Sequence, residues 1–151
     1  MKKPTPKTRL VTDAVAAMLL IATYLTGHAD PHVHAFLGLL LAVAVIVHAV
    51  QAHRKIASTT RHLSSRSMDP HTKLDCCMGL AMALFLIAAL ASGVFLMKLR
   101  MAEGLSFDEA AGMPAGIVHM ASAALFLICA VVHLVLNKEG FERLLQKERA
   151  A

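Results

Sequence analysis

The chain has 151 residues, of which 57% are hydrophobic and 17% charged, with a formal net charge of +5. This hydrophobic share is well above that of an ordinary globular domain. The charged residues gather at the two ends and in two connections between long apolar runs. The basic charges are therefore placed to meet lipid headgroups rather than nucleic acid. We expect an integral membrane protein with a single domain over residues 1–151.

Four apolar segments are each long enough to cross about 30 Å of hydrocarbon as an α-helix. The predicted helices cover residues 9–27, 33–53, 73–97 and 115–137. The first two are joined by a short turn, so they must be antiparallel neighbours. The predicted fold class is all-α, a bundle of four transmembrane helices in up-down-up-down order.

The connections differ in character. Residues 54–72 are rich in Ser, Thr, Arg and Lys and contain Asp69-Pro70, which predicts a solvated loop. Residues 98–114 contain Ser106 and Glu109 at the spacing of a capping box, which predicts a short surface helix. The tail from Lys138 has an amphipathic pattern and is expected to lie along the membrane surface.

The lysines and arginines predict the orientation. The N-terminal tail carries four with Arg9 included, the loop between the second and third helices five with Lys73 included, and the C-terminal tail four, whereas the turn after the first helix has none. Because cytoplasmic segments carry the excess of Lys and Arg, both ends should be cytoplasmic. The expected location is a bacterial inner (plasma) membrane.

Two of the predicted helices each carry two histidines that are 14 residues apart: His34 and His48, and His119 and His133. Fourteen residues rise roughly 21 Å and end about 40° from the starting direction, so both rings look out from one face. Up-down order makes these two helices parallel. His34 is then opposite His119 near the outer side, and His48 is opposite His133 near the inner side.

An imidazole in hydrocarbon needs a partner. Two nitrogen ligands at each of two levels are the axial set that b-type haem iron takes. The spacing therefore predicts two haem b groups. The outer iron would be held by His34 and His119, and the inner iron by His48 and His133.

The two halves of the chain also repeat. A shift of 85 residues places His119 on His34 and His133 on His48. Thr26-Gly27 near the end of the first helix matches Ser92-Gly93 in the third. This pattern predicts two parallel two-helix repeats related by an axis along the membrane normal.

The same shift places Ala123 on Gly38, and both lie one turn from an outer histidine. Small residues there would let a flat macrocycle approach the backbone, and small residues equally serve helix packing in membranes. The sequence does not favour either interpretation, and both residues are candidates for cofactor binding.

Other readings of the polar residues compete with haem. Zinc favours histidine but wants four close ligands, and a proton relay usually adds carboxylates at membrane depth. His28 and His32 beside His34 suit either copper or zinc, or are interface histidines. Asp13 meets the N-terminal dipole of its helix and can pair with Arg9, or it serves quinone or proton handling.

These residues resemble the di-haem membrane cytochromes b, and more narrowly the small four-helix cytochromes associated with flavinylation. The likeness is carried by the segment LVTDAVAAMLLIATYLTG at residues 10–27, by H-x3-G from His34 and by the repeated histidine pair. It covers roughly residues 9–138. The chain departs from the pattern in having no tryptophan and in having Ala123 opposite Gly38.

The resemblance implies electron transfer through two haems, from quinol to an extracytoplasmic redox partner such as a flavin or cytochrome protein. The chain would then be the cytochrome b subunit of an oxidoreductase system, with axial ligands His34, His48, His119 and His133. Asp13, Asp75 and His53 are candidates for a quinone site. The alternatives are a membrane haem oxidoreductase acting alone on superoxide or quinone, and a non-haem metal-handling protein.

Overall fold

The computed structural model describes residues 5–27, 29–61 and 69–138, together with 140, 142 and 146. Over these residues the regular structure is helical throughout, with α1 (Pro6–Thr26), α2 (Pro31–Arg61), α3 (Pro70–Glu103), α4 (Phe107–Gly112) and α5 (Pro114–Leu136). Four stretches are long and apolar enough to cross a membrane: Lys7–Thr26, Pro31–Arg54, Pro70–Glu103 and Pro114–Leu136. The predicted all-α fold with four transmembrane helices is confirmed, and the chain is a multi-pass membrane protein.

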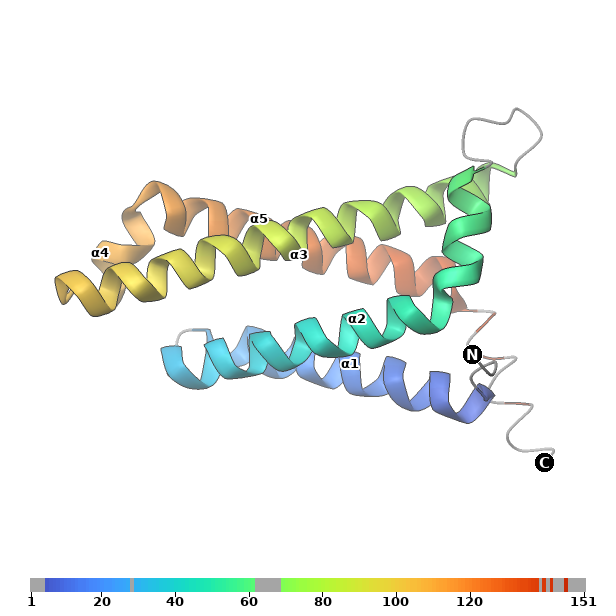
Figure 1. Ribbon diagram of the computed structural model, residues 1–151, viewed down its shortest axis with the longest axis horizontal. Coiled ribbons are helices and arrows are strands. Elements are labelled where there is room, and N and C mark those ends of the chain that lie inside the picture. The colour runs from blue at the N-terminus through green and yellow to red at the C-terminus, as the bar shows by residue number, and fades with distance from the viewer. Residues whose placement is uncertain are drawn as a thin grey trace. The chain divides into compact units, whose positions relative to one another are not determined.

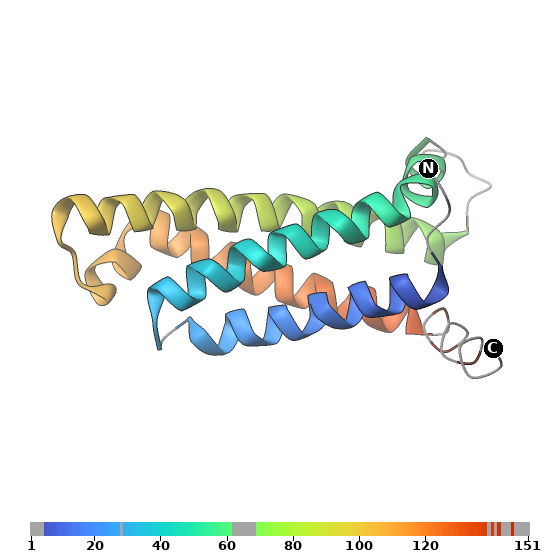
Figure 2. The same ribbon diagram turned by 60° about the horizontal axis from the view of Figure 1, so that its bottom comes forward.

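The chain divides into two compact units, Met1–Cys76 with Val135–Ala151, and Cys77–Leu134. In the first unit, α1 and α2 lie side by side and antiparallel (Figure 1). In the second, α3 and α5 run in opposite directions, with α4 between them in the chain (Figure 2). Each unit is therefore built on a helical hairpin.

Each of the four long helices begins at a proline, whose missing N–H costs nothing at that position. Asp30 caps α2, because its Oδ1 accepts the backbone N–H groups of His32 (2.8 Å) and Val33 (3.2 Å). Asp69 does the same for α3, where its Oδ2 accepts the N–H of Thr72 at 3.1 Å. Two Asp-Pro pairs thus start two membrane helices.

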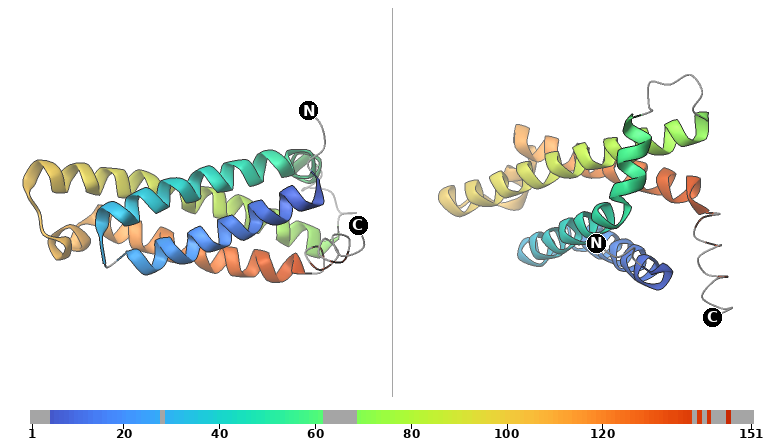
Figure 3. Two further views of the ribbon diagram at one scale, coloured as in Figure 1. Left: turned by 90° about the horizontal axis from the view of Figure 1, so that it is seen from below. Right: turned by 45° about the vertical axis from the view of Figure 1, so that its right-hand side comes forward.

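The predicted loop over residues 54–72 is wrong for residues 54–61, because α2 continues to Arg61, and α3 already starts at Pro70. The change to polar residues marks where the apolar stretch ends, but Arg, Lys and Ala remain good helix formers. Beyond the apolar stretch α2 turns steeply (Figure 3, right). Near there His53 Nδ1 donates to the Val50 carbonyl of its own helix at 2.7 Å, a bond that competes with the helical ladder and favours a bend.

The predicted capping box and short helix between the last two spans are confirmed. Ser106 Oγ accepts the N–H of Glu109, and Glu109 Oε2 accepts the N–H of Ser106 at 2.8 Å. The Ser106 hydroxyl and its backbone N–H hold the pKa of Glu109 below its ordinary value of 4.5. Gly104, at φ +66°, turns the chain at the end of α3, in a conformation that favours glycine.

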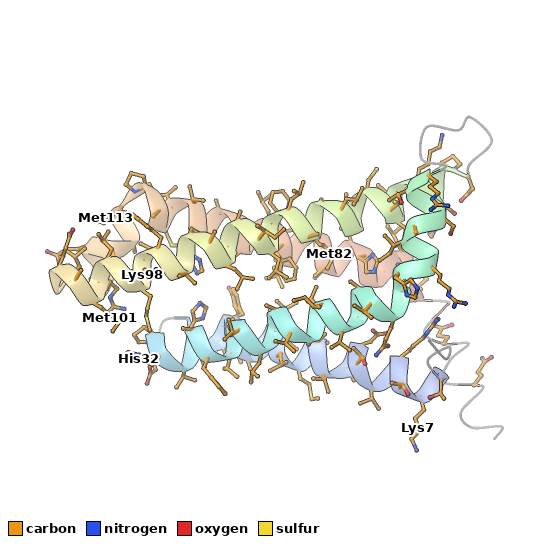
Figure 4. All side chains as sticks on the ribbon, viewed as in Figure 1. Lys7, His32, Met82, Lys98, Met101 and Met113 are labelled. Carbon is orange, nitrogen blue, oxygen red and sulfur yellow. The ribbon has the colours of Figure 1, made fainter. Side chains whose placement is uncertain are left out.

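Large apolar side chains project from the outer surfaces of the helices (Figure 4). Leu25 is 69% exposed, Leu84 68% and Met101 76%, whereas Phe126 is only 5% exposed. Burying such a side chain away from water is worth roughly 1.5–3 kcal/mol. These surfaces fit the acyl chains of lipid. Cys129 is also buried.

Both tails lie largely outside the described residues. The N-terminal segment is described only from Thr5 onward. The amphipathic segment after Lys138 depends on Phe141, Leu144 and Leu145, of which none is among the described residues.

Replacing Asp30 by Ala should lower the Tm of the protein in detergent at pH 7 by about 2–4 °C, the usual effect of losing an N-terminal cap. The N–H groups of Val33 and His32 hold the pKa of Asp30 below its ordinary value of 3.8. The carboxylate therefore stabilises the fold fully above 3.8 and less as the pH falls through the lowered pKa. Asp30→Asn, which keeps an acceptor oxygen, is the control. A wild-type advantage that grows on acidification would contradict this assignment.

Candidate functional site

His34 on α2 is held by the end of α1. Its Nδ1 lies 2.9 Å from the backbone carbonyl of Thr23. Because α1 ends here, the N–H of Gly27 turns to the Tyr24 carbonyl at 3.3 Å. The Thr23 carbonyl accepts instead from the imidazole and, at 3.2 Å, from the Thr26 hydroxyl. The short connection brings the first turn of α2 level with the last turn of α1.

His119 on α5 is held in the same way by α3. Its Nδ1 lies 2.8 Å from the backbone carbonyl of Ala89. The hydroxyl of Ser92 is shared between that carbonyl, at 3.2 Å, and the carbonyl of Ala88, at 2.6 Å. Gly93 contacts the ring closely, since a Cβ added there would come within 2.9 Å of His119 Cε1. At this position only glycine leaves room for the imidazole.

The two arrangements share one register. Thr23 and Ala89, which supply the carbonyls, each lie three residues before the hydroxyl residue and four before the glycine of the Thr26-Gly27 and Ser92-Gly93 pairs. The small sequence match between the halves is therefore a repeated structural element, in which a carbonyl receives both a hydroxyl and an imidazole. Each compact unit contains one copy.

His48 has a different partner. Its Nδ1 lies 2.6 Å from Oδ1 of Asp13, which comes from α1. The side chains of His48 and Asp13 are 43% and 32% exposed. One turn further along α2, Gln51 Nε2 donates to the Thr12 hydroxyl at 2.8 Å. The predicted pairing of Asp13 with Arg9 is replaced by this hydrogen bond across the hairpin.

The remaining candidates are placed as follows. His133 lies half-buried in the last turn of α5, with the predicted spacing from His119. A Cβ at Gly38 would lie 3.9 Å from the Thr23 side chain, so the packing of α1 on α2 does not require glycine there. Ala123 is exposed. The proposed roles of Gly38 and Ala123 at a macrocycle stay predictions.

The bonds at Nδ1 decide the chemistry of the rings. A carbonyl or carboxylate oxygen only accepts, so His34, His48 and His119 must each carry a proton on Nδ1. In the neutral ring of this tautomer the lone pair is on Nε2. Histidines that bind metals show this arrangement, because the bond at the second nitrogen fixes the tautomer and the ring direction and raises ligand basicity.

Two other polar candidates also have hydrogen-bond partners. Asp75 accepts from Asn137 Nδ2 at 2.5 Å, and His53 donates within its own helix. Among the described residues there is no group of three or more His, Cys, Asp and Glu suited to a metal ion. His28, part of the suggested copper or zinc set with His32, lies outside them.

No protein-family model, curated protein or solved structure matches this chain. The functional argument consequently depends on the residues themselves. Sequence reasoning found the four histidines, but it missed the carbonyls of Thr23 and Ala89 and the contact between Asp13 and His48. A backbone acceptor has no signature in side-chain identity, although the repeated Thr26-Gly27 and Ser92-Gly93 pairs were a hint.

Gly93→Ala should destabilise the protein, whereas Gly79→Ala on the same helix should be neutral or stabilising. The added methyl at residue 93 displaces His119 from the Ala89 carbonyl, and a lost buried hydrogen bond costs about 1–3 kcal/mol. At Gly79 a Cβ meets nothing within 4 Å, so the gain in helix propensity of about 1 kcal/mol remains. Reversible unfolding in detergent measures the difference. Equal stability of the two variants would show that the contact at Gly93 is unimportant.

Proposed function

We propose that this protein is a transmembrane electron-transfer cytochrome that binds two haem b groups through four histidines. The observation that supports it best is the common state of three of them. His34, His48 and His119 each bond an acceptor through Nδ1, across to a neighbouring helix. Each ring is thereby prepared to bind iron through Nε2.

The assignment of ligands to the two haems comes from the sequence spacing. His34 with His119 form the outer couple, and His48 with His133 the inner couple, roughly 21 Å apart along the helices. The chemistry of the donors fits haem iron, which accepts two axial imidazoles. The duplicated carbonyl and hydroxyl element at His34 and His119 supports equivalent roles for these two residues.

The chain's residues would hold and orient the ligands while the apolar helices keep water away. Haem, when bound, supplies one-electron exchange between ferrous and ferric iron. The proposed donor is quinol, which gives up two electrons and two protons as it becomes quinone. The proposed acceptor is an extracytoplasmic flavin or cytochrome protein. The membrane would be a bacterial inner membrane, with both chain ends in the cytoplasm.

A pyridine haemochrome assay on purified protein from cells well supplied with haem should give about two b haems per chain. We expect His34→Ala and His48→Ala each to remove mainly one haem, with the low-temperature visible spectrum losing one component. His53→Ala is the matched control. Its Nδ1 is also bonded to a carbonyl, but within its own helix and at an exposed position.

Two results would defeat the proposal. One is colourless wild-type protein from such cells. The other is an unchanged spectrum in both histidine variants.

Single cysteines introduced into a cysteine-free variant should test the orientation. At Ala29, in the turn between α1 and α2, a cysteine should react with a membrane-impermeant maleimide added to intact spheroplasts. A cysteine at Ala57, near the end of α2, should react only after the membrane is opened. Both positions are exposed. The opposite pattern of labelling would reverse the proposed orientation.

A further inference from the structure

The hydrogen bond between His48 and Asp13 in the first hairpin makes one histidine chemically different from two others. The rings of His34 and His119 donate to neutral backbone carbonyls at 2.9 and 2.8 Å. The ring of His48 donates to a carboxylate oxygen of Asp13 at 2.6 Å. Hydrogen bonds to an ionised acceptor are shorter and roughly twice as strong as neutral ones.

The acceptor at Nδ1 alters the ligand at Nε2. A carboxylate draws the Nδ1 proton toward itself and leaves more electron density on the ring than a carbonyl does. A more basic ligand stabilises ferric iron relative to ferrous iron, and hydrogen bonding to the ligands is one of the means by which a protein sets a haem potential. An imidazole bonded to Asp13 should therefore lower the potential of its iron.

We infer that Asp13 is a positioning residue that makes the haem held by His48 the lower-potential haem of the two. The inference rests on the proposed function, because it concerns the haems assigned there. The carboxylate acts through His48 and touches neither substrate nor iron. The asymmetry favours ferrous iron at the end of the hairpin that carries His34.

A purely structural reading of the pair is the main rival. Asp13 and His48 would then only join α1 to α2, as Gln51 and Thr12 do one turn away. Removal of the carboxylate would in that case lower stability and leave both potentials where they were. Measured reduction potentials therefore distinguish the two roles, whereas a measured loss of stability does not.

The test is an optically monitored redox titration of purified holoprotein with mediators. Wild type should show two waves. We expect His48→Ala to remove the lower-potential wave and His34→Ala the higher one. Asp13→Asn keeps an acceptor oxygen but loses the charge. It should raise the lower wave by a roughly tenfold change in the equilibrium constant for reduction, about 59 mV for one electron, and leave the other wave in place.

Asp69→Asn is the matched control. It removes a carboxylate at the start of α3 that bonds the N–H of Thr72 rather than a histidine, and Asn still caps the helix. Equal shifts in Asp13→Asn and Asp69→Asn would mean a general field effect and would overturn the inference. So would unchanged potentials in Asp13→Asn.

If Asp13→Asn does not retain its haem, His48→Ala and His34→Ala still test the inference, because they show which wave belongs to which haem. Loss of the higher wave in His48→Ala overturns the inference while leaving the haem proposal intact. Wild-type protein without haem overturns both.

Discussion

An imidazole inside a membrane must find an acceptor for its N–H, and three histidines of this protein satisfy that need between neighbouring helices. Three rings reach from one helix to a carbonyl or carboxylate on the next. Those bonds join α1 to α2 and α3 to α5. They also determine which nitrogen of each neutral ring carries the lone pair, so the same contact that holds the helices together gives the rings the tautomer that the proposed ligand role needs.

The repetition of this contact gives the internal duplication a physical meaning. Thr23 and Ala89 offer carbonyls in the same register to His34 and His119. At Thr23 the helix is ending, so the carbonyl has lost its helical N–H. Ala89 lies inside the longer helix α3, and its carbonyl oxygen has a second lone pair that accepts the imidazole. The two carbonyls become available in different ways, but each holds an imidazole in the same arrangement.

The two ends of the first hairpin offer different acceptors. At the other end of the first hairpin the acceptor is Asp13, a carboxylate inside a membrane helix. Such a charge is costly in hydrocarbon unless it is paired, and intramembrane carboxylates usually mark function. Its partner is a histidine that the sequence had already singled out as a ligand. If the protein binds the two proposed haems, this contact gives one of them a ligand with a different partner.

The sequence alone determined the all-α class, the four spans and the capping box at Ser106, because hydrophobicity, helical period and caps depend on neighbours along the chain. It placed the end of α2 too early. The change to polar residues marks where the apolar stretch ends, and a helix can continue beyond that point. Only the tertiary structure decided the partners of the rings. Asp13 and His48 are 35 residues apart, and their contact depends on the register of two helices. The carbonyls of Thr23 and Ala89 are backbone groups, which every residue has and which folding alone selects.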